Sequence, residues 1–188
     1  PYIAEIRRAQ EATTFFAELS NSEQKEWIDE LLHRTAFTDG NVAICLLDTG
    51  VTASHPLLAQ AVNLDHVQAV KSAWGVGDHQ GHGTEMAGIA LYNNLKDALV
   101  RKTKIEMPQK IESVKILPPT GGNDPDLYGA ITEQAVSLAE IANPFVDRVI
   151  CMAVTSPEYN TFDGSPTSWS AAVDSITSGA DEESMKRL

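Results

Sequence analysis

Residues 42–50 read VAICLLDTG, an apolar run that leads without a polar break into Asp-Thr-Gly. A short apolar run without polar alternation is typical of a strand that is buried on both faces, as in a parallel sheet. Asp48 ends this predicted strand, at the edge where open α/β sheets bind their ligands. Gly50 would let the backbone turn sharply away while the carboxylate of Asp48 stays in place. Taken alone, an Asp that ends a strand in a turn is equally consistent with a structural role.

Two more apolar runs, at residues 111–117 and 146–154, predict further buried strands. Helical patterns of apolar residues separate the strands, at about 84–95 and 127–142. A last helix is expected to run to Gly179, with Ser165 as its N-cap and Pro166 at its first position. Strands that alternate with helices predict an α/β fold with a mainly parallel sheet.

The first part of the chain has a different character. Residues 3–36 show apolar residues at helical spacing, and Ser22 is expected to cap the second of two helices. The turn cluster Thr-Asp-Gly-Asn at 38–41 separates this arm from the rest of the chain. We therefore expect an N-terminal helical segment at 1–38, whose apolar stripes pack on an α/β unit at 39–188.

Composition limits the partners of the chain. Its 188 residues include 14 Lys and Arg against 26 Asp and Glu, a formal net charge of −12. Such a surface repels phosphate, so neither nucleic acid nor an anionic membrane is an expected partner. No apolar run approaches the roughly 18 residues that span a bilayer.

Two features of the sequence bear on its cellular location. It shows no export signal, which favours a cytoplasmic location, but it starts at Pro1 without a Met, so further residues are expected upstream. Cys45 and Cys151 lie inside apolar runs without disulfide-type spacing, so we expect buried free thiols.

The segment GHGTEMAG at residues 81–88 is the second candidate site. The glycines on both sides of His82 permit tight turning at the start of the predicted helix. The positive end of the helix dipole disfavours a protonated His, and a general base must be neutral before it reacts. A single His near a helix start is usually structural, but these defined neighbours favour a functional one.

Together, LLDTGVTASHP at 46–56 and GHGTEMAG at 81–88 resemble the Asp and His signature segments of the subtilisin-like (S8) serine peptidases. The order Asp, then His, then Ser is that of subtilisin. SVKIL at 113–117 and the later predicted elements follow in the family's order. The resemblance covers residues 41–188 and implies a subtilisin-like three-layer fold with a mainly parallel sheet, incomplete at its C-terminal end.

This resemblance implies a serine endopeptidase without a cofactor. Asp48 would orient His82, whose other nitrogen takes the proton of a serine hydroxyl during peptide hydrolysis through an acyl-enzyme. A peptide or protein substrate would pair as an extra strand with Ala153, Val154 and Thr155. The loop around Gly121 and Gly122, which continues to residue 124, would flank the other side of the peptide.

Some family features are absent. No Gly-Thr-Ser-x-Ala segment carries a nucleophile, and the oxyanion Asn is missing, so the chain would supply Asp and His only and be inactive alone. Thr155 stands where the family usually has Gly, which should narrow the specificity pocket. Leu57 replaces a calcium-binding Asp of many secreted members, so no metal is expected there. The missing strands would leave an apolar edge at 149–154, through which the fragment could self-associate.

Three alternatives remain open. Asp-Thr-Gly also marks aspartic peptidases, but these are all-β proteins and the helical patterns argue against them. Asp78, His79, His82 and Glu85 lie within eight positions and could bind zinc or iron in a metal-dependent hydrolase. The third alternative is a non-catalytic pseudo-peptidase or interaction domain.

Overall fold

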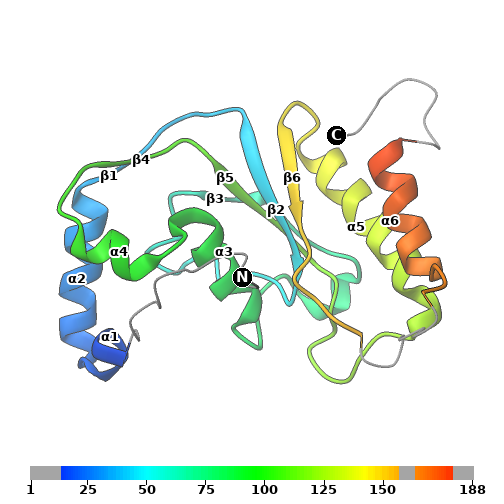
Figure 1. Cartoon of the computed structure of the whole chain (residues 1–188), viewed down its shortest axis with the longest axis horizontal. Helices are drawn as coiled ribbons and strands as arrows, with labels where there is room; N and C mark the ends of the chain where they lie inside the picture. Colours follow the sequence, from blue (N-terminus) through cyan, green and yellow to red (C-terminus); the bar gives the residue numbers. More distant parts are fainter. Residues whose placement is uncertain (1–13, 157–163, 180–188) are drawn as a thin grey trace, which may run out of the picture.

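Figure 1 shows the computed structural model of the chain, in which residues 14–156 and 164–179 are described. The strands are β1 (Thr35–Phe37), β2 (Val42–Asp48), β3 (Val62–Ala69), β4 (Ile105–Met107), β5 (Lys110–Lys115) and β6 (Asp147–Cys151). The α-helices are α1 (Thr14–Glu18), α2 (Asn21–His33), α3 (His82–Tyr92), α4 (Leu95–Val100), α5 (Tyr128–Ala142) and α6 (Ser168–Ser178). Short 3-10 helices occupy η1 (Ser72–Trp74) and η2 (Pro125–Leu127).

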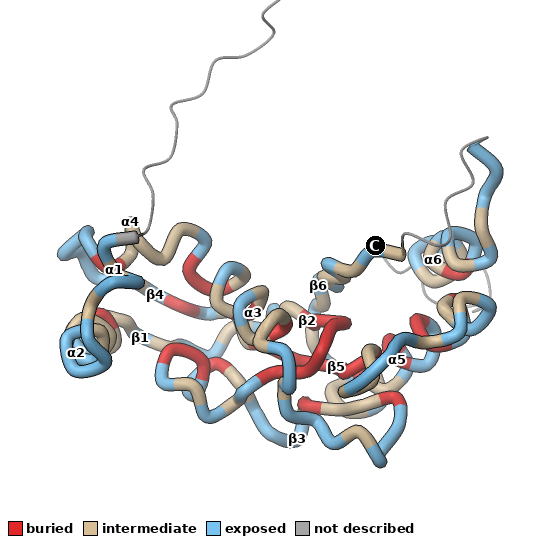
Figure 2. Tube along the Cα trace, turned by 90° about the horizontal axis from the view of Figure 1, so that it is seen from below, coloured by how far each residue is buried: buried red, intermediate tan, exposed pale blue. Residues whose placement is uncertain are grey.

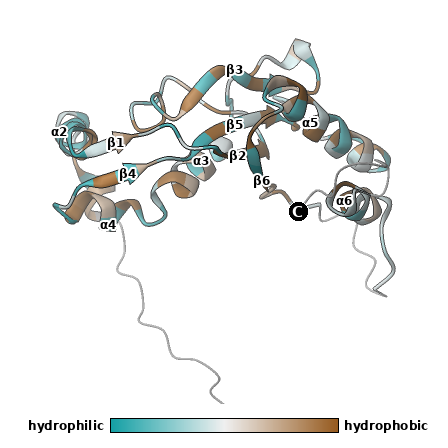
Figure 3. Ribbon diagram, turned by 90° about the horizontal axis from the view of Figure 1, so that it is seen from above, coloured by the Kyte–Doolittle hydropathy of each residue, from teal (hydrophilic) through white to brown (hydrophobic). Residues whose placement is uncertain are grey.

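Strands β2 and β5 form the centre of a four-stranded sheet in the order β3-β5-β2-β6, with all neighbours parallel. Figure 2 shows that buried residues concentrate along these two strands, and Figure 3 shows that hydrophobic residues follow them. Ala43, Cys45 and Leu47 in β2 are fully buried, as is Ile111 in β5. The prediction that continuous apolar runs form buried parallel strands is therefore confirmed for both.

Helices cover both faces of this sheet. Because side chains alternate along a strand, Leu46 belongs to a core shared with Ala87 of α3, whereas Leu47 belongs to a second core shared with Ala135 of α5. Helix α6 lies outside α5 (Figure 1). The structure thus has the α/β architecture with a parallel sheet that was expected from the sequence. In the described part of the chain, no helix has the length and apolar character required to cross a bilayer.

Helix α6 approaches α5 closely because the contact is made of small residues. A Cβ added to Gly129 would lie 3.2 Å from the Cβ of Ala172. Beside this contact the indole of Trp169 donates a hydrogen bond to Thr132 Oγ1 at 3.0 Å. The helix begins at Ser168 and is capped by Thr167, whose side chain and that of Ser170 form a reciprocal capping box. The predicted N-cap at Ser165 was therefore wrong, while the stop at Gly179 is confirmed by its φ of 66°.

The N-terminal arm is not entirely helical. Residues 35–37, predicted as helix, form strand β1 and pair in parallel with β4. The N-cap of α2 is Ser20 rather than Ser22, since the side chains of Ser20 and Glu23 each accept a hydrogen bond from the other's backbone N–H in a capping box. The prediction for residues 3–13 falls outside the described part of the chain. Leu31 is completely buried in the core on the α3 side, so the described arm packs on the α/β unit.

A buried ion pair connects strand β6 to the interior. Arg148 Nε lies 2.6 Å from Glu112 Oε2, and the other carboxylate oxygen accepts a hydrogen bond from Asn143 at 2.8 Å. Arg148 also donates to the backbone carbonyl of Ala139, near the end of α5, and to that of Asn143, the C-cap of the same helix. Both oxygens of Glu112 and two of the guanidinium nitrogens of Arg148 therefore have partners of opposite polarity, which favours burial of the pair.

The two thiols lie on opposite faces of the sheet. Cys45 belongs to the core beside α5, whereas Cys151 packs against the core beside α3. Both are free, and burial raises the pKa of Cys45 to about 12. A protonated, buried thiol of this kind is chemically inert.

Strand β6 lies at one end of the described sheet, where β2 is its neighbour. Val149 and Ile150 of this strand are 58% and 39% exposed. An exposed apolar edge can pair with an edge strand of another molecule. We therefore predict that the chain self-associates through β6, and that sedimentation velocity shows a sedimentation coefficient rising with concentration.

Val149→Lys should abolish this association, because a charge on an edge strand opposes pairing. The matched control is Leu64→Lys, which alters an apolar residue that is 72% exposed on β3, at the other end of the sheet. A monomeric wild-type chain, or association that only the Leu64 variant removes, would contradict the prediction.

Candidate active site

Asp48 is buried at the carboxyl end of β2, with only 1% of its surface exposed. The backbone N–H of Thr49 donates to its Oδ1 at 2.7 Å. Gly50 follows with a φ of 101°, and a Cβ at that position would lie 2.6 Å from the carbonyl oxygen of Val76. The chain can thus turn away immediately after the strand because residue 50 is Gly.

His82 is the first residue of α3, and its Nδ1 lies 2.7 Å from Asp48 Oδ1. The carboxylate is enclosed, whereas the imidazole side chain is 43% exposed. A buried acceptor thus holds a ring that reaches the surface. The strand end and the helix start that carry the two signature segments meet side by side, as their resemblance to the peptidase motifs requires.

The pKa of His82 is raised, primarily by its hydrogen bond with Asp48. Partial burial opposes this change, and the charges of Asp48, Glu85 and Asp78 add to it. The expectation from the helix dipole, that the protonated form is disfavoured, was therefore wrong in direction. Three carboxylates around one imidazole outweigh the partial positive charge of the helix end.

The turn before α3 is organised by Asp78. Its Oδ1 accepts hydrogen bonds from Thr49 Oγ1 and from the N–H groups of Gln80 and Gly81. Its Oδ2 accepts from both the N–H and the hydroxyl of Thr84. Burial alone would raise the pKa of Asp78, but these hydrogen bonds prevail and lower it to about 2.

This use of Asp78 weighs against the metal-binding alternative. Both of its oxygens already accept hydrogen bonds from the turn and from the start of α3. Across residues 14–156 and 164–179, no three His, Cys, Asp or Glu side chains lie close enough together to hold a metal ion. The geometry therefore gives Asp78 a role in shaping the helix start, and it does not bring Asp78, His79, His82 and Glu85 together as a metal site.

Close backbone packing joins the two signature segments. Thr49 Oγ1 accepts a hydrogen bond from the N–H of Gly83 at 2.9 Å, so the residue after Asp48 binds the residue after His82. A Cβ at Gly83 would lie 2.1 Å from the carbonyl oxygen of Gly50. Neither the role of Thr49 nor the cap by Asp78 was predicted from the sequence. The contacts of Thr49 with Asp78 and Gly83 join segments that are distant in the sequence, so no local pattern reveals them.

The predicted substrate-binding residues follow the flanking strands. Strand β6 ends at Cys151 and is shorter than the predicted run to residue 154, and Met152 separates it from Ala153, Val154 and Thr155. Ala153 and Thr155 are exposed, and Val154 is half-buried. Gly121 and Gly122 are exposed in the loop after β5. Since β5 and β6 lie on either side of β2, the two segments leave the sheet on either side of Asp48.

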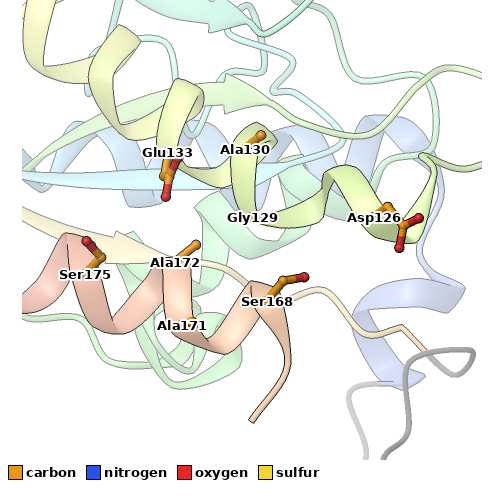
Figure 4. Close-up of a pocket in the computed structure, with 8 residues that line it drawn as sticks. All are labelled: Asp126, Gly129, Ala130, Glu133, Ser168, Ala171, Ala172 and Ser175. Atoms are coloured by element: carbon orange, nitrogen blue, oxygen red, sulfur yellow. The ribbon is translucent and has the colours of Figure 1, made fainter.

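A groove of about 390 Å³ between α5 and α6 contains none of these residues (Figure 4). Its walls are the small residues of the helix contact and two carboxylates, those of Asp126 and Glu133. It lies on the outer helical layer, away from the carboxyl end of β2.

The glycine contact can be tested by two substitutions in one helix. Gly83→Ala should destabilise the chain by about 3 kcal/mol or more, since its methyl group would overlap the backbone at Gly50. Gly88→Ala, where a Cβ meets nothing within 4 Å, should instead stabilise the chain by roughly 0.5–1 kcal/mol. Urea unfolding measures both changes. Equal effects of the two substitutions would contradict the close packing of Gly83 on Gly50.

Comparison with known proteins yields no match among curated proteins and none among solved structures. The sequence model of the Subtilase family, peptidase family S8, matches residues 39–187. The matched range contains both Asp48 and His82, and it leaves the N-terminal arm outside. Because the match extends over most of the sequence, the chain belongs to the subtilase family of serine peptidases.

Proposed function

We propose that this chain supplies the Asp and the His of a subtilisin-type triad in a serine endopeptidase. One observation carries the proposal: the hydrogen bond of 2.7 Å between the buried carboxylate of Asp48 and the half-exposed imidazole of His82. Family membership supports this class of enzyme, and the contact supports the proposed roles of the two residues.

The contact supports a direction for the proposed proton transfer. With Nδ1 of His82 bound to Asp48, the ring's Nε2 is the nitrogen that takes the proton of a serine hydroxyl. The serine oxygen then bonds to the peptide carbonyl carbon, and the imidazolium returns the proton to the leaving amine. Asp48 stabilises the imidazolium between these steps, which agrees with the raised pKa of His82.

A peptide substrate would lie along residues 153–155. This segment continues from edge strand β6, and Ala153 and Thr155 are exposed, so an extended peptide can pair with its backbone. The side chain of Thr155 would restrict the specificity pocket to small residues. The loop at Gly121 and Gly122 would border the peptide on its other side.

The serine and the oxyanion donor would come from residues outside this sequence. Ser170, for example, is engaged in the capping box of α6 on the outer helical layer. The chain alone should therefore not hydrolyse peptides. The coding sequence after Leu188 decides between the enzyme and a non-catalytic pseudo-peptidase, since only the enzyme requires a Gly-Thr-Ser segment there.

Fluorophosphonate labelling of the full-length protein tests this proposal. The probe should modify one serine, and His82→Ala should reduce the labelling rate by about 10³-fold or more because the base is lost. His79→Ala is the matched control, since it removes an exposed imidazole three positions away and should leave labelling unchanged. A folded full-length protein that is not labelled would support the pseudo-peptidase instead.

The carboxylate–imidazole pair can also be tested in this chain alone. NMR titration should give a pKa for His82 above its ordinary value of 6.5, and Asp48→Asn should lower it towards that value. The pKa of His82 is higher in the folded than in the unfolded chain. The stabilisation from protonated His82 beside Asp48 is therefore present below pH 6.5 and disappears as the pH rises through the folded pKa. Urea unfolding at several pH values should show this loss, and the loss should be absent in Asp48→Asn. A His82 pKa that does not respond to Asp48→Asn would refute the pairing.

A further inference from the structure

Lys115 is the last residue of β5 and is only 1% exposed. Lysine is almost never fully buried unless its ammonium group is paired, because removing the charge from water is costly. The proposed triad does not use this residue. Its burial beside Asp48 therefore requires a separate explanation.

The position of Lys115 follows from the register of the sheet. Asp48 and Lys115 are paired across β2 and β5, so both side chains leave the sheet on the face covered by α3. From there the Lys115 ammonium donates a hydrogen bond of 2.8 Å to the backbone carbonyl of Gly77. A residue at the end of a central strand thus holds the turn that precedes α3.

This turn touches both halves of the candidate site. A Cβ at Gly50 would lie 3.0 Å from the Gly77 carbonyl oxygen that Lys115 binds, so this oxygen packs against the turn after Asp48. The next residue, Asp78, accepts the hydrogen bonds that fix the start of α3. Movement of Gly77 would therefore shift the support of His82 as well as that of Asp48.

The charge of Lys115 is retained at a cost. Burial lowers the pKa of its ammonium group, and the negative charge of Asp78 partly opposes this effect. A methionine of similar length would fill the same space without desolvating a charge. The ammonium group, rather than the bulk of the side chain, is accordingly the part with a specific task.

We propose that Lys115 is a positioning residue for the Asp48–His82 pair. Its ammonium group clamps the carbonyl of Gly77, and the clamped turn holds the start of α3 so that the imidazole of His82 reaches the carboxylate of Asp48. The contacts of Lys115 and His82 are those described above, and the importance of Lys115 for catalysis rests on the proposed peptidase function.

The test compares two lysines of the same strand in isotope-labelled chain. Lys115→Met should lower the pKa of His82 towards 6.5 and remove the downfield resonance of its Nδ1 proton, because the hydrogen bond to Asp48 is lost. Lys110→Met, which removes an ammonium paired with exposed Asp39 at the other end of β5, should change neither signal.

The direction in which the pKa of His82 changes in Lys115→Met distinguishes a positioning role from a purely electrostatic one. If Lys115 acted only through its positive charge, its removal would raise the pKa of His82, since a nearby cation disfavours the imidazolium. A raised or unchanged pKa in folded Lys115→Met would therefore overturn the proposal. A variant that only unfolds at lower urea concentration, with both His82 signals intact, would show a merely structural role and would also overturn it.

A second measurement covers the case in which Lys115→Met does not fold. In the unmodified chain, urea below the unfolding midpoint should abolish the exchange protection of the Lys115 ammonium and of the His82 Nδ1 proton at the same concentration. Loss of one while the other stays protected would refute the coupling. None of these readouts requires peptide hydrolysis, so a failure of the peptidase proposal in fluorophosphonate labelling remains distinguishable.

Discussion

The burial of one carboxylate constrains the whole carboxyl end of the sheet. An ionised group removed from water destabilises a protein by several kcal/mol unless donors surround it. Asp48 Oδ1 accepts from Thr49 N–H and lies 2.7 Å from His82 Nδ1, two groups that only a sharp turn and a closely packed helix start can bring together. Its Oδ2 is buried without a hydrogen-bond partner among the described residues. The glycines of both signature segments, and the acidic residue of the turn between them, serve this requirement.

The same region combines rigidity with exposure. Gly50 and Gly83 allow backbone to lie on backbone, and Asp78 binds the start of α3 through both of its oxygens. The imidazole nevertheless remains partly open to solvent, while its partner is sealed in the sheet. A general base needs this combination, because it must keep its orientation and still reach a substrate. The parallel order of the strands adds loops on both sides of Asp48, where a peptide can be bound.

Long, uniform sequence patterns predicted the central elements well. The apolar run of β2 and the helical spacing of α5 extend over enough residues to identify each element, and both lie where expected. Strands β1 and β4 have three residues each and gain their stability from each other, so no local pattern reveals them. Edge strand β3 was also missed, because most of its side chains remain accessible and its register shifts.

The site shows the same division between local and distant causes. The pairing of Asp48 with His82 was predictable, since two distinct segments resembled one family. The role of Asp78 was not, because its partners lie on both segments and a carboxylate among histidines equally suggests a metal ligand. Lys115 was included in a predicted strand, where a charged residue inside an apolar run was the available signal.

The contact between α5 and α6 has a separate consequence. Helix α6 is attached through a seam in which Gly129 faces Ala172 and Trp169 reaches Thr132, while the Asp48–His82 pair lies on the opposite side of the sheet. A larger side chain at the glycine would release this helix as a cooperative unit without disturbing the imidazole. The outer helical layer and the region around Asp48 and His82 can therefore undergo sequence change independently, each tolerating mutations that the other would not.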